Sequence, residues 1–153
     1  MFCFQCQETA GNKGCTKVGV CGKNENTANS QDLLIYVTKG LSEVVNKIGE
    51  VDSKYYDLIS NNMFVTITNA NFDEEDILRK VEETIKAKDK LIKENKIENL
   101  SDAAKYTSDD RDELKRKAIE VGVLNIINED ERSLVELVTY GLKGMAAYNH
   151  HAN

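Results

Sequence analysis

This chain of 153 residues contains no proline and no tryptophan, and it has only two histidines. Without proline, nothing in the sequence forces a helix to end, so long helices are permitted. No apolar run approaches the roughly 18 residues that a membrane-spanning helix needs, so we expect no membrane insertion. His150 and His151 are neighbours, and neighbouring residues on a helix point about 100 degrees apart. We therefore assign these two histidines no role as metal ligands.

Positive charge is also scarce. The 20 lysines and arginines are outnumbered by 26 aspartates and glutamates, which gives a net charge of -6 and a pI near 5.0. This balance argues against nucleic acid or an anionic membrane as the main partner. The first residues form neither the basic leader nor the apolar run of a signal peptide, and Cys3 lies where a leader would be removed. We expect a soluble, cytoplasmic protein with an interior large enough to fold without metal.

Cysteine is absent after position 21, and all four cysteines lie near the start of the chain, with two, eight and five residues between them: Cys3, Cys6, Cys15 and Cys21. In a reducing compartment such a group more often binds metal than forms disulfides. Glycines alternate with these cysteines, and neither a helical nor a strand period is visible there. The sequence therefore predicts an irregular metal-binding loop over residues 1–26, followed by a helical domain over residues 27–153.

Four thiolates suit either zinc or an iron–sulfur cluster. A structural zinc site usually has two close cysteine pairs, whereas Cys15 and Cys21 are separated by five residues, so the spacing favours a cluster. Backbone amides of the glycine-rich loop could stabilise a reduced, negatively charged cluster. The loop lysines Lys13, Lys17 and Lys23 are expected to be solvated, with a role in raising the cluster potential or in docking an acidic electron donor as the alternative.

Apolar residues return at helical spacing after the loop, and they predict five helices, over residues 27–48, 53–68, 73–93, 108–122 and from 129 onward. The segment "MFVTIT" could instead form a short strand. Asp73 and Ser108 are the expected N-caps of the third and fourth helices, and residues 94–107 are expected to be a polar connection.

The fourth and fifth helices also carry apolar residues at helical spacing. We expect the fourth to turn Leu114, Ala118, Ile119 and Val121 inward, and the fifth to use Leu134, Leu137, Val138, Met145 and Tyr148. Gly141 and Gly144 either bend or break the fifth helix or let another helix approach closely. We expect Tyr55, Tyr56 and Tyr148 to be core or rim aromatics. The fifth helical pattern runs into "YNHHAN" without a stop signal, which predicts that the natural chain continues.

The sequences of several segments resemble those of one known family. "MFCFQCQET", "GCTKVGVCGK", "QDLLIYVTKGL", "TNANFD" and "SLVELVTYGLKGMAAYNHHA" are similar to the N-terminal region of the hybrid cluster protein family, also called prismane or hydroxylamine reductase. The resemblance covers essentially the whole chain. It implies an all-α first domain built of two three-helix bundles, here truncated, and two α/β domains after it.

The resemblance also implies a function. In that family the spacing of Cys3, Cys6, Cys15 and Cys21 belongs to a cubane [4Fe-4S] cluster, which receives electrons from a soluble donor. A hybrid iron–sulfur–oxygen cluster in the later α/β domains then reduces hydroxylamine to ammonia and water. Since this chain has no cysteine after Cys21, it is expected to be an electron-transfer fragment without catalytic residues.

Two alternatives belong to other classes. A zinc-stapled or metal-free helical module could serve for interaction or dimerisation, because a helical face without its partner favours self-association. A relative of the nickel carbon monoxide dehydrogenase group would have a similar fold, but its cysteine spacing differs.

Overall fold

The computed structural model describes residues 2–3, 14–67 and 70–152. These residues form six α-helices and one 3-10 turn, in the order α1 (Glu25–Ile48), α2 (Ser53–Val65), α3 (Glu74–Asn95), α4 (Asp102–Lys105), α5 (Arg111–Glu120), η2 (Val123–Asn125) and α6 (Glu129–Ala152). No strand occurs within the described ranges, where the only extended pairing is an isolated bridge between Cys3 and Cys15. The predicted all-α class is confirmed. The strand alternative for "MFVTIT" is wrong for residues 63–65, which end α2, while Thr68 lies outside the described residues.

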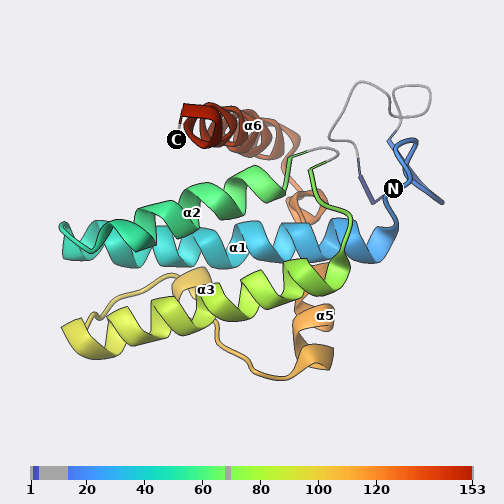
Figure 1. The fold of residues 1–153 in the computed structure, drawn as a ribbon. Coiled ribbons are helices and arrows are strands. Elements are labelled where there is room, and N and C mark those ends of the chain that lie inside the picture. Colours follow the sequence, from blue (N-terminus) through green and yellow to red (C-terminus); the bar gives the residue numbers. More distant parts are fainter. Residues whose placement is uncertain (1, 4–13, 68–69, 153) are drawn as a thin grey trace.

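Helix α1 is the centre of the fold. Helices α2, α3, α4 and α5 all pack against it, whereas α6 lies mainly across α2 (Figure 1). One buried cluster joins α1 to α3 and α5 through side chains such as Leu34, Ile77 and Leu114. A second cluster joins the other end of α1 to α2, α3 and α4. The division into two three-helix bundles stays a prediction.

Side-chain caps explain where the helices begin. Asn24 accepts a hydrogen bond from the Thr27 amide at 2.7 Å, so α1 begins slightly earlier than predicted. Asp73 accepts from two free amides of α3, as predicted. For α5 the prediction was wrong: Asp110 is the cap, and Ser108 instead accepts from the amide of Asp110. The carboxylate of Asp110, two residues later, accepts from the first free amides of α5, those of Asp112 and Glu113.

The connection predicted over residues 94–107 contains the short helix α4. Its Ala104 is fully buried against α1. The carbonyl of Ala104 accepts a hydrogen bond from the buried ammonium of Lys88 at 2.8 Å. This segment is therefore part of the packed body, although its polar composition predicted only a connection.

Two expectations about inward faces are corrected. Ile119 is 65% exposed, although Leu114 and Ala118 of the same helix are buried as predicted and Val121 is half-buried. Helix α6 turns small and polar residues toward the body, whereas its larger apolar residues are exposed: Leu134, Leu137, Val138, Met145 and Tyr148. Helical spacing identified this apolar face correctly, but no described part of the chain covers it.

The two glycines of α6 neither break the helix nor admit a neighbour. Helix α6 is continuous through Gly141 and Gly144, so the predicted break is wrong. A Cβ at either position would meet no atom within 4 Å, so nothing in the described ranges approaches them closely. Of the tyrosines expected in the core or at its rim, Tyr55 is buried, Tyr56 is partly exposed and Tyr148 is exposed.

Candidate metal centre

An antiparallel bridge brings two of the four cysteines together. The amide of Phe2 donates to the carbonyl of Cys15 at 2.9 Å, and the amide of Cys15 donates to the carbonyl of Cys3 at 2.7 Å. Phe2 and Cys15 are buried against Ala28 of α1, and Cys3 packs beside them. The bridge thus holds Cys3 and Cys15 opposite each other on the first turn of α1.

The third described cysteine lies on a tight turn just before α1. The amide of Gly19 donates to the carbonyl of Lys23 at 2.7 Å, and Cys21 is exposed between them. A Cβ at Gly19 would lie 2.8 Å from that carbonyl oxygen and 3.3 Å from the Cys21 sulfur, so the turn requires glycine there. Gly22 has a positive φ of 91°, which also favours glycine.

Cys6, the fourth predicted ligand, lies outside the described residues. Within the described ranges, no group of three or more His, Cys, Asp or Glu side chains is arranged to hold a metal. The chemistry of the donor set nevertheless fits an iron–sulfur cluster, because soft thiolates come from adjoining backbone turns in which glycines leave room beside the sulfur.

A buried lysine connects the cysteine turn to the helical body. Lys23 is only 1% exposed and donates to the side-chain oxygen of Gln31 at 2.7 Å. The amide group of Gln31 in turn donates to the carbonyl of Asn71 at 2.9 Å, just before α3. The expectation that Lys23 is solvated was therefore wrong. Lys17 is exposed, as expected, and Lys13 lies outside the described residues.

A second buried lysine approaches the cysteines from α6. The ammonium of Lys143 donates to the carbonyl of Thr66 at 3.2 Å. Burial lowers the pKa of Lys143, while the negative charges of Asp32, Glu136 and the Cys3 thiolate act to raise it. The ammonium therefore lies within electrostatic reach of Cys3.

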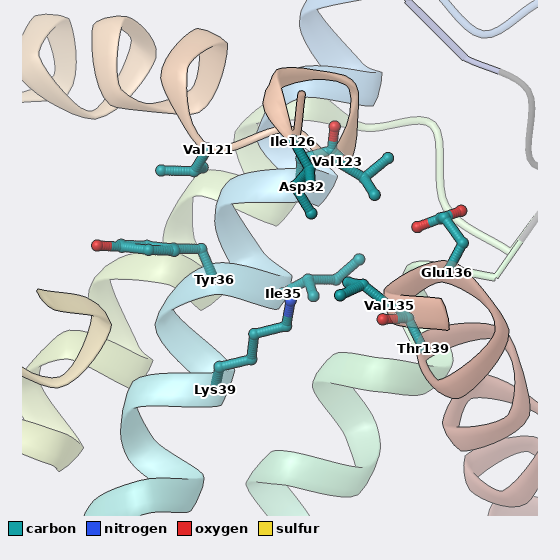
Figure 2. A pocket seen from close by; sticks show the side chains of 10 residues that line it. All are labelled: Asp32, Ile35, Tyr36, Lys39, Val121, Val123, Ile126, Val135, Glu136 and Thr139. Atoms are coloured by element: carbon teal, nitrogen blue, oxygen red, sulfur yellow. The ribbon is translucent and has the colours of Figure 1, made fainter. Parts of the chain in front are cut away.

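The carboxylates beside Lys143 are themselves perturbed. Burial raises the pKa of Asp32 from 3.8 to about 7, against the opposing pull of nearby lysines. Burial also raises the pKa of Glu136. Figure 2 shows Asp32 and Lys39 of α1 and Glu136 and Thr139 of α6 around a small cavity of about 50 Å³. At neutral pH Asp32 thus carries only part of its negative charge.

Sequence reasoning missed these buried polar groups, although one signal was present. Gln31 lies on the same face of α1 as the buried apolar residues Leu34 and Leu41. A polar residue within an apolar stripe requires a partner. The partner of Gln31, Lys23, could not be identified from spacing alone.

The two histidines have a packing role. The ring of His150 stacks on Phe64 with centroids 4.0 Å apart, and His151 meets the same ring edge-on. In the part of the chain that the structure describes, no helix is long and apolar enough to cross a membrane.

Comparison with known proteins shows similarity along the whole chain. The sequence model of the Prismane/CO dehydrogenase family matches residues 1–153. The chain is 49% identical to a hydroxylamine reductase of Acetivibrio thermocellus, covering 99% of the chain and 29% of that relative. It is 51% identical to a hydroxylamine reductase of Clostridium perfringens, covering 99% and 30% respectively. A hydroxylamine reductase of Methanocaldococcus jannaschii is 47% identical, covering 99% and 29%.

These comparisons define both the likeness and its extent. The chain spans 29 to 30% of the length of these curated relatives, so most of each relative has no counterpart here. Proteins of the Prismane family are iron–sulfur proteins. The cysteine bridge and turn described above are the parts of this chain whose chemistry suits that property.

Proposed function

Because the chain belongs to the Prismane/CO dehydrogenase family, we propose that it is the N-terminal electron-transfer part of a hydroxylamine reductase. The observation that carries this proposal is the 47 to 51% identity to hydroxylamine reductases over 99% of the chain. The same identities favour hydroxylamine reductase over the carbon monoxide dehydrogenase branch of the family.

In this proposal a cubane [4Fe-4S] cluster is bound by Cys3, Cys6, Cys15 and Cys21. When bound, such a cluster accepts and releases one electron at a time. The chain's own contribution is positional: the backbone bridge fixes Cys3 against Cys15, and burial of Phe2 and Cys15 keeps water from that side. Glycine at positions 19 and 22 lets the turn that carries Cys21 close.

The reduction itself belongs to the rest of the enzyme. Converting hydroxylamine to ammonia and water consumes two electrons and two protons. A soluble donor would supply the electrons, and the cluster held by the four cysteines would pass them on one at a time. This chain has no cysteine after Cys21 and cannot build a second thiolate-bound cluster. We therefore assign it no catalytic residue, and its natural partners are the donor and the enzyme's own C-terminal domains.

Metal analysis of anaerobically purified protein tests the proposal. We expect a brown protein with about four irons and four sulfides per chain. Replacing Cys15 by serine should abolish the iron while the helical circular dichroism survives, because the main core clusters of α1 contain no cysteine. A colourless protein that holds one zinc would contradict the proposal. Loss of most helicity in the Cys15→Ser protein would show instead that loop and helices fold as one unit.

The exposed face of α6 favours a second candidate function, an interaction module. Leu134, Leu137 and Met145 are all more than 60% exposed on this helix. An apolar groove of about 740 Å³ continues from α6 to α1 and α2 and is lined by Met63 and Ala146 among others. In the enzyme we propose that the C-terminal domains cover this face. Light scattering across a dilution series of this chain distinguishes self-association from a monomer.

A further inference from the structure

We propose that the buried lysines Lys23 and Lys143 raise the reduction potential of the cluster. The inference rests on the proposed function, since it requires a bound cluster. It assigns to two residues outside the ligand set a role in tuning electron transfer.

Lys143 brings its charge from a distant part of the chain. Its side chain is 7% exposed, and its ammonium reaches the carbonyl of Thr66 at the end of α2. From this position it interacts electrostatically with the Cys3 thiolate. A carbonyl partner does not neutralise the ammonium, and in a poorly solvated site a charge acts over a longer range than at the surface.

Lys23 brings a second charge from within the cysteine turn. It lies two residues after Cys21, and its backbone carbonyl closes the turn by accepting from Gly19. Its ammonium donates to the neutral amide of Gln31. Among the described residues, neither Lys23 nor Lys143 has a carboxylate oxygen within 4.0 Å.

The surrounding charges leave a positive excess. Asp32 and Glu136 face Lys143 with negative charge, and Lys23 faces it with positive charge. Lys39 adds a further positive charge next to both carboxylates. Asp32 is partly protonated at neutral pH, so the two buried lysines, Lys23 and Lys143, face fewer than two full negative charges. Lys39 is exposed, so water screens its contribution. A cluster gains negative charge when it is reduced, so this excess stabilises the reduced form and raises its potential.

Redox titration of the cluster-loaded protein, followed by electron paramagnetic resonance, tests the assignment through charge changes of opposite sign. Lys143→Gln and Lys23→Gln should each shift the potential to more negative values. Glu136→Gln removes a neighbouring negative charge and should shift it to more positive values. Lys17→Gln is the matched control, because Lys17 lies in the same loop but is exposed. It should shift the potential least, since water screens its charge.

Iron and sulfide contents equal to those of the parent protein ensure that each comparison concerns an intact cluster. Lys143→Arg keeps the charge and should keep the parent potential, which a purely steric role does not require. The inference is overturned if Lys143→Gln and Lys23→Gln shift the potential no more than Lys17→Gln, or if Glu136→Gln shifts it in the negative direction. If a lysine variant loses its cluster, the reduction potentials of Glu136→Gln and Lys143→Arg still test the inference. Absence of iron from the parent protein would instead refute the proposed function.

Discussion

Gly40 in the middle of α1 provides a sharp test of how the helices pack. A Cβ built at this position would lie 2.3 Å from the carbonyl oxygen of Ala103 and 2.6 Å from its carbonyl carbon. Both atoms belong to the backbone of α4, so no side-chain rotation can relieve the overlap. Replacing Gly40 by alanine must therefore move α4 away from α1.

Two opposing effects set the magnitude of this change. Alanine improves helix propensity by about 1 kcal/mol relative to glycine. Overpacking a close contact costs about 1–3 kcal/mol, and α4 resists displacement because Lys88 holds the carbonyl of Ala104 and the Ser101 hydroxyl bonds Glu43. Taking the upper end of the packing cost, we expect Gly40→Ala to lower the free energy of unfolding by about 2 kcal/mol.

Gly141→Ala in α6 is the matched control. A Cβ at Gly141 meets nothing within 4 Å, so only the gain in helix propensity remains. We expect this variant to be more stable by about 0.5–1 kcal/mol. Urea unfolding followed by far-ultraviolet circular dichroism measures the free energy of unfolding of both variants. In thermal unfolding, the loss in Gly40→Ala should appear as a fall in melting temperature of about 4–8 °C. A Gly40→Ala protein as stable as the parent would refute the packing of α4 on α1.

Two further predictions concern charge and exposure. The pKa of Asp32 is about 7 in the folded protein and ordinarily 3.8, so the folded state retains this proton and loses stability as the pH rises from about 4 to about 7. Asp32→Asn should thus stabilise the protein against urea at pH 8 more than at pH 5, and an equal effect at both pH values would contradict this. Leu114 is fully buried, so Leu114→Ala should lower the free energy of unfolding by about 2–5 kcal/mol. Leu137 is 69% exposed, so Leu137→Ala should lower it by under about 0.5 kcal/mol in the same urea assay. Similar losses in the two variants would contradict the observed burial.

The sequence predicted the helices well where local chemistry determines them. Asp73 precedes a run of acidic residues and then an apolar face, and α3 begins directly after it. The predicted end of the first helix at residue 48 is confirmed, and Gly49 follows it with a positive φ of 91°, which favours glycine. Such signals act within one or two turns of a helix, so they can be recognised without knowledge of the rest of the fold.

Exposure of the α6 face shows what helical spacing cannot decide. The spacing of Leu134, Leu137 and Val138 identifies an apolar face but contains no information about what covers it. In the described structure the body instead contacts Thr139, Lys143 and Ala146 on the other face. Which face of α6 is buried and which is exposed can therefore be read only from the packed structure.

The sequence predicts ligands for the candidate site but contains no signal for its surroundings. The spacing of Cys3, Cys15 and Cys21 is a local property, and the bridge between the first two agrees with a shared site. The lysines are different: Lys23 resembles any loop lysine, and Lys143 is separated from Cys3 by most of the chain. Their burial depends on partners in α1 and at the end of α2, which no local pattern reveals.

The cysteine loop and the helical body have separate apolar clusters but are connected by hydrogen bonds. Among the described residues their apolar clusters are distinct: Cys15 packs with Phe2, Ala28 and Cys3, whereas the main clusters join α1 to the other helices. The connection between loop and body is polar, and it runs from Lys23 through Gln31 to the segment before α3. Loss of a thiolate should thus leave the helices folded, because it removes nothing from their core. Under the proposed function, a charge change at Lys23 should still affect a bound cluster, because Lys23 belongs to the turn that carries Cys21.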